Sequence, residues 1–140
     1  MRKIDLHVHS RLSKSFDYDH ANLERLIRLA KRRGLDALAL TEHIHAVNFW
    51  DMHQWLLDNF DYRDGKYYID EEFSVLSGAE VTVGERVDFI VVGPLDQLHN
   101  LDQAFRPRLS EWNHAPALEF AEAARARTSG AETPAARTVN

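Results

Sequence analysis

The sequence predicts an α/β protein whose helices connect neighbouring parallel strands. An alternating apolar and polar segment at residues 3–10 reads as one strand, and a nearly continuous apolar segment at residues 35–40 reads as a second. A helical pattern lies between them. Two strands joined through a helix by short connections form a βαβ unit, and its strands run parallel. Metal-binding residue types follow both strands, at the edge where α/β proteins place their chemistry.

The composition is that of a soluble, globular domain. The 140 residues are 44% hydrophobic and 28% charged, and the net charge is −5 without a long basic run, which argues against a dedicated nucleic-acid surface. Cysteine is absent, so any metal must be held by His, Asp or Glu. No apolar segment is long enough to span a membrane and no signal peptide is recognisable, so we expect a cytoplasmic protein.

The first strand carries the strongest chemical signal. Apolar residues alternate with Asp5, His7 and His9, so a strand turns these three side chains to one face. Two imidazoles spaced two residues apart converge on one metal ion. The alternative is a polar strand face that is rich in histidine and binds no metal.

A helix is expected from His20 to Arg33. Asp19 can cap its amino terminus and Gly34 can end it. Its apolar residues recur at helical spacing along one face: Leu23, Leu26, Ile27 and Ala30.

A second metal-capable cluster follows the strand at residues 35–40. Glu42 and His43 stand directly after this strand, with His45 two residues further on. If the two strands are parallel, this cluster and the first one leave the sheet at the same edge.

An aromatic helix is expected at residues 47–60. Core packing is the favoured interpretation of its apolar face and of His53.

Glu80 is the third candidate ligand. It lies near the end of an apolar strand expected at residues 73–83, in which Gly78 indicates a close backbone approach or a bulge. A buried carboxylate must be paired, hydrogen-bonded or bound to metal. A salt bridge to Arg86 is the alternative to metal binding.

The remaining elements are predicted from local patterns. Residues 61–70 read as an exposed connection with an Asp64–Gly65 turn, and residues 67–69 can form a short strand. A strand at 87–94 and helices at 95–105 and 117–127 follow. The tail at residues 128–140 has the composition of a disordered segment.

Three motifs together resemble those of the PHP (polymerase and histidinol phosphatase) superfamily. They are Asp5-Leu6-His7-Val8-His9-Ser10, Thr41-Glu42-His43 and Gly78-Ala79-Glu80-Val81. The resemblance spans residues 3–95. It implies a truncated PHP-like domain over residues 1–127, folded as a partial (β/α) barrel with metal ligands at the carboxyl ends of its parallel strands. It also implies hydrolysis of a small-molecule phosphoester or nucleotide by a metal-activated water, with one to three Zn, Mn or Fe ions.

Carried over by position, the resemblance implies a role for each candidate. His7 and His9 would hold one metal, Glu80 would bridge two, and His43 would bind a third. Asp5 and Glu42 would orient the imidazoles. His45 has no clear family counterpart and could line the pocket.

The chain also departs from the family pattern. The loop after the first motif offers only Asp17 where members carry a further ligand, and the later His-Pro and Asp-x-His motifs are missing. Two explanations stay open: a homo-oligomer that completes the barrel, and a chain shortened by a frameshift or an annotation error. The alternatives are a truncated or degenerate fragment that binds metal without catalysis, and an amidohydrolase-like fragment, since that family also uses a His-x-His pair.

Overall fold

The computed structural model describes residues 1–10, 18–84, 87–108 and 117–128. Its elements in chain order are β1 (Ile4–Val8), α1 (His20–Arg32), β2 (Ala37–Leu40), α2 (Phe49–Asn59), β3 (Asp61–Arg63), β4 (Lys66–Tyr68), β5 (Ser74–Thr82), β6 (Asp88–Val92), α3 (Leu95–Phe105), the short 3₁₀ helix η1 (Arg106–Arg108) and α5 (Ala117–Thr128). None of the helices in these ranges combines the length and apolar character needed to cross a bilayer.

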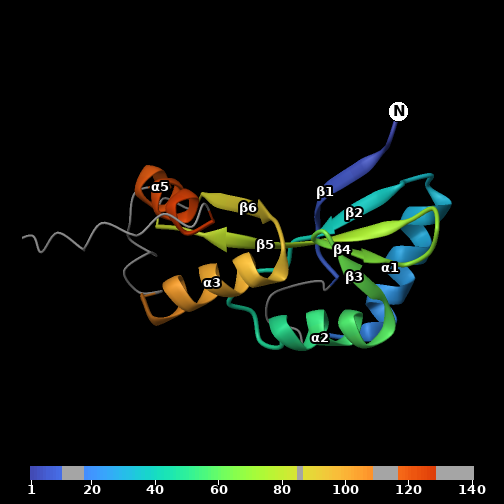
Figure 1. Ribbon diagram of the computed structural model, residues 1–140, viewed down its shortest axis with the longest axis horizontal. Coiled ribbons are helices and arrows are strands. Elements are labelled where there is room, and N and C mark those ends of the chain that lie inside the picture. Colours follow the sequence, from blue (N-terminus) through green and yellow to red (C-terminus); the bar gives the residue numbers. More distant parts are fainter. Residues whose placement is uncertain (11–17, 85–86, 109–116, 129–140) are drawn as a thin grey trace, which may run out of the picture.

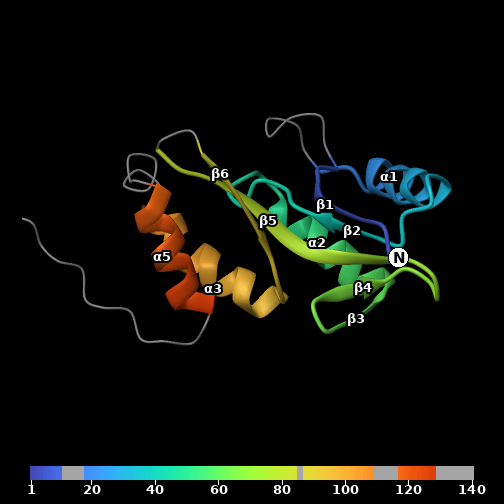
Figure 2. The same cartoon turned by 90° about the horizontal axis from the view of Figure 1, so that it is seen from above.

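The strands form one mixed sheet in the order β1-β2-β5-β4-β3, and β6 pairs with the carboxyl half of β5 (Figure 1). β1, β2 and β5 are parallel, as the βαβ pattern predicts, whereas β3, β4 and β6 are in antiparallel pairs. The α/β class is therefore confirmed. In both views α3 and α5 lie beside β6, at the opposite end of the molecule from α1 (Figures 1 and 2).

Helix α1 forms where its sequence predicts. The Asp19 side chain accepts a hydrogen bond of 2.9 Å from the Ala21 amide, and the predicted stripe is buried at Leu23, Ile27 and Ala30. Gly34 has φ +74°, a left-handed conformation that glycine adopts without a steric penalty and that ends the helix. The apolar face covers the sheet, while the cationic last turn complements the helix dipole.

Residues 61–70 differ from the prediction. They form the hairpin of β3 and β4 rather than an exposed connection, and Tyr67 is completely buried. Asp64 and Gly65 both have positive φ, which matches the type I′ turn that favours two-residue hairpins. The short strand is confirmed, one residue earlier than predicted. The expectation of exposure was wrong. The polar turn residues suggest a loop, but Tyr62 and Tyr67 beside them pack together.

His53 is a core residue, as the sequence indicates. It is 1% exposed, and its Nδ1 lies 2.8 Å from the hydroxyl oxygen of Tyr67. Its Nε2 atom is buried without a hydrogen-bond partner among the described residues. Burial lowers the pKa of His53 to about 4, because a charged imidazole has no compensating partner there.

This buried histidine predicts a pH-dependent stability. The unfolded chain takes up the proton with a pKa of about 6.5, whereas the folded chain takes it up only near 4. Folding stability is therefore intact above about pH 6.5 and falls by up to about 3 kcal/mol as the pH drops to about 4. Urea unfolding at pH 7 and pH 4.5, followed by tryptophan fluorescence, measures this loss.

A matched pair of variants assigns the loss to His53. His53→Gln keeps a polar partner for Tyr67 but does not titrate, so the difference between the two pH values should shrink by most of that amount. His99→Gln changes an exposed histidine on α3 and should leave the difference unaltered. Equal pH dependence in wild type and His53→Gln would contradict the assignment.

Candidate metal centre

Backbone pairing brings the three sequence motifs together at one edge of the sheet. The β2–β5 register places Leu40 opposite Ser77, and the chain after β2 continues beside β5. His43 forms a parallel bridge with Glu80, supported by hydrogen bonds from the Glu80 amide to the Glu42 carbonyl and from the Ile44 amide to the Glu80 carbonyl. The second and third motifs are therefore adjacent through main-chain contacts alone.

The first motif is attached to this edge by Thr41. The Thr41 amide donates to the carbonyl of Val8 at 2.9 Å, and its hydroxyl oxygen lies 3.1 Å from the Val8 amide nitrogen. These contacts hold the carboxyl end of β1, where His7 lies and which His9 follows directly. Thr41 belongs to the second motif, but the sequence offered no sign of this positioning role.

Three side chains converge at the end of β1. The Nε2 atom of His7 lies 2.7 Å from Glu80 Oε2, and the Nε2 atom of His9 lies 3.0 Å from the same oxygen. The two Nε2 atoms are 3.0 Å apart. Glu80 is only 4% exposed, so its charge needs compensation at this position.

These three groups fit a divalent metal ion. Each presents one ligand atom, and the three atoms lie within 4.8 Å of one another. Two imidazole nitrogens with one carboxylate oxygen is a donor set of catalytic zinc sites, in which further coordination positions stay open to water or substrate. The same donors also suit manganese or iron, so the geometry does not distinguish these metals.

His43 approaches the other oxygen of Glu80. Its Nδ1 atom lies 3.2 Å from Glu80 Oε1, and its ring centre is 5.2 Å from that of His9. The two carboxylate oxygens thus face different imidazoles: Oε2 faces His7 and His9, and Oε1 faces His43. A carboxylate placed in this way can bridge two metal ions, which is the role that the resemblance implies for Glu80.

The carboxylate of Glu42 lies near the second ring nitrogen of His9. It is completely buried, its Oε1 atom accepts hydrogen bonds from the amide and the hydroxyl of Ser10, and its Oε2 atom lies 3.6 Å from His9 Nδ1. A carboxylate near the second ring nitrogen helps to set the tautomer and orientation of a metal-binding imidazole. Asp5 lies differently, because its Oδ1 atom accepts from the backbone amide of His7 rather than from an imidazole.

His45 lines a hollow of about 310 Å³, and Arg106 lines it too. The His45 ring centre is 6.0 Å from that of His43. Arg106 bonds to Asp102 and also donates to the Ile44 carbonyl at 3.0 Å, which fixes the loop between the two histidines. Sequence reasoning missed Arg106, since no motif links it to a loop 62 residues away.

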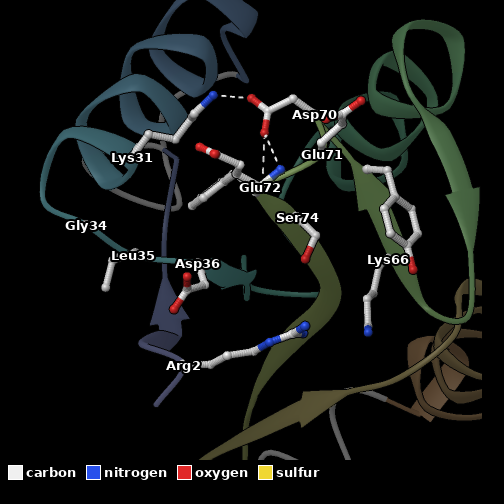
Figure 3. A pocket seen from close by; sticks show the side chains of 12 residues that line it. Arg2, Lys31, Gly34, Leu35, Asp36, Lys66, Asp70, Glu71, Glu72 and Ser74 are labelled. Carbon is white, nitrogen blue, oxygen red and sulfur yellow. Dashed lines mark hydrogen bonds and ion pairs between the residues drawn. The ribbon is translucent and has the colours of Figure 1, made fainter.

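A second hollow, of about 620 Å³, lies at the amino-terminal ends of β1, β2 and β5 (Figure 3). Lys31 forms an ion pair with Asp70 at this hollow, and its other charged side chains include both signs. Because this hollow lies at the opposite ends of the parallel strands from the histidines, it is not part of the candidate metal centre.

Two residues named in the sequence analysis lie outside the described residues. They are Asp17, a possible further ligand, and Arg86, an alternative partner of Glu80.

Comparison with protein families matches the PHP domain over residues 5–126. The chain belongs to the PHP domain family. The domain is also similar to the crystal structure of PsfC from Pseudomonas syringae PB-5123, with 30% identity, a TM-score of 0.61 and coverage of 72% of this chain. The matched part is 43% of PsfC, so this PHP chain spans less than half of that relative. A search of curated proteins gives no match.

Proposed function

We propose that this PHP domain is a metal-dependent phosphoesterase. The observation that carries the proposal is the convergence of His7, His9 and Glu80 on a common point within hydrogen-bond distances. Membership of the PHP family supports a phosphate ester as the substrate class. A divalent metal held by these residues supplies Lewis acidity toward water and toward phosphate oxygens.

We propose a separate role for each residue in and around the candidate metal site. Glu80 supplies the negative charge that attracts a cation, and the Glu42 carboxylate, 3.6 Å from His9 Nδ1, favours the orientation in which His9 Nε2 faces Glu80. The hollow lined by His45 and Arg106 offers room for the substrate next to His45, whose ring centre is 6.0 Å from that of His43. The Arg106 side chain is partly exposed and its guanidinium is paired with Asp102, so it offers a hydrogen-bond donor rather than an unpaired charge to a phosphate group on that side of the centre. We further propose a small phosphoester or a nucleotide as the substrate.

Hydrolysis of an aryl phosphate by the purified full chain, with Mn²⁺ or Zn²⁺ added, tests this function. We expect activity that is lost on chelation and restored by adding metal. His7→Ala removes a ligand and should reduce activity at least about 100-fold. His99→Ala, on an exposed histidine outside the cluster, should keep it.

Three other outcomes would overturn the proposal. Metal binding without hydrolysis of any phosphate ester would favour a degenerate domain. Hydrolysis of amides in place of phosphates would favour amidohydrolase-type chemistry. Activity that His7→Ala leaves unchanged would point to a contaminating enzyme.

A further inference from the structure

Strand β1 is an edge of the sheet, and it is unusually exposed. β2 is its one partner among the described residues (Figure 1). Every residue from Ile4 to His7 is exposed. Leu6 is 54% and Ile4 is 47% exposed, although β2 beside them is buried along its whole length. An apolar strand edge of this kind is a template for pairing with another strand.

The sequence of β1 is complementary to itself. The Val8 amide and carbonyl already bond to Thr41, and β1 shifts register against β2 between Asp5 and Val8, so the residues open to a second strand are Ile4 to His7. When two copies run antiparallel with Leu6 opposite Leu6, Asp5 stands opposite His7. On one face of the pair Leu6 then meets Leu6 of the second copy. The other face places a carboxylate against an imidazole on both sides of the two-fold axis, which is a favourable cross-strand pair.

Asp5 and His7, the residues that would meet, each have one polar atom that makes no hydrogen bond within the described part of the chain. Asp5 uses Oδ1 for the amide of His7, and its Oδ2 atom has no hydrogen-bond partner within the described part of the chain. His7 directs Nε2 toward Glu80, and its Nδ1 atom likewise has no such partner in those ranges. In the antiparallel pair, Oδ2 of one copy comes within reach of Nδ1 of the other.

We propose that two copies of this chain pair through antiparallel β1 edges, and that Asp5 of each copy accepts a hydrogen bond from Nδ1 of the partner's His7. This bond keeps the proton on Nδ1 and leaves the lone pair on Nε2, the form of imidazole that binds metal. Asp5 therefore acts as a positioning residue across the interface, not within its own chain. The effect on metal affinity rests on the proposed metal-dependent function, but the pairing itself does not.

The pairing is tested first, in chelator, by light scattering over a concentration series. Wild type should reach twice the mass of one chain. Leu6→Lys places two like charges opposite each other on the axis and should give single-chain mass at every concentration. Leu29→Lys changes a leucine of α1 that is also 47% exposed and should remain paired. Circular dichroism checks that both variants are folded.

The role of Asp5 is tested by metal titration of four proteins: wild type, Asp5→Asn, Leu6→Lys and the double variant. Asp5→Asn should weaken Mn²⁺ or Zn²⁺ binding about 10- to 100-fold in the paired protein. It should have no further effect in the unpaired Leu6→Lys protein. An equal loss in both backgrounds would place the action of Asp5 within one chain and overturn the cross-chain role.

The outcomes separate this inference from the proposed function. A single-chain mass in wild type, or a paired mass that Leu6→Lys leaves unchanged, would overturn the interface even if phosphate esters are hydrolysed. A paired protein that binds no metal would instead overturn the proposed function and the effect of Asp5 on it, while the interface would stand.

Discussion

Glu80→Gln is expected to weaken the binding of Mn²⁺ or Zn²⁺ at least about 100-fold and to abolish phosphate ester hydrolysis. The change keeps the size of the side chain but removes the charge that faces His7, His9 and His43. Since both carboxylate oxygens take part in the cluster, no neighbouring group replaces them within the described site. Isothermal titration of the metal-free protein measures the affinity directly.

Thermal unfolding gives an independent measure of the same change. A ligand that binds only the folded state at 100 times its dissociation constant stabilises that state by about 2.7 kcal/mol. Added metal should therefore raise the melting temperature of wild type but not that of Glu80→Gln. Glu71→Gln alters an exposed glutamate at the other end of β5 and should behave as wild type. If Glu80→Gln retains the metal-induced shift, the site lies elsewhere.

Gly78→Ala is expected to lower the free energy of unfolding by about 2–3 kcal/mol. A Cβ atom at this position would lie 2.8 Å from the Val91 carbonyl oxygen, 3.0 Å from Thr41 Cγ2 and 3.3 Å from the Leu40 carbonyl oxygen. Two of these atoms belong to the backbone of neighbouring strands and can move only if the sheet opens. The prediction of a close approach at Gly78 is thus confirmed.

Denaturation with urea measures this loss, and the melting temperature should fall by roughly 6–10 °C. Gly93→Ala is the matched control, because its Cβ atom would meet only the Gln97 side chain, at 3.7 Å. Because Gly78 lies two residues before Glu80 on β5, the variant should also weaken metal binding. Equal stability of the two variants would show that the sheet absorbs the extra methyl group.

Much of the candidate metal centre was predictable because its candidate ligands stand at the ends of recognisable strands. Alternation in β1 and the apolar segment of β2 placed His7 and His43 at one sheet edge, and the resemblance to the PHP family added Glu80 of β5. The parallel pairing of these three strands confirms the geometric basis of that prediction. Prediction failed at residues 61–70, where the burial of Tyr67 depends on contacts with distant elements.

What the sequence determined by itself is local. The cap at Asp19, the stop at Gly34 and the turn at Asp64–Gly65 depend on backbone preferences and on bonds between near neighbours. Such features require no knowledge of the rest of the chain, because the interacting groups are separated by only a few rotatable bonds.

What only the tertiary structure decided is which distant groups meet. His7 and Glu80 are 73 residues apart, Ser10 and Glu42 are 32 apart, and Arg106 reaches a carbonyl 62 residues before it. These contacts follow from strand register and helix packing, which shift side chains by several ångströms for each residue of slippage. Local preferences do not determine that register, because it is set by the summed packing of the whole sheet against its helices.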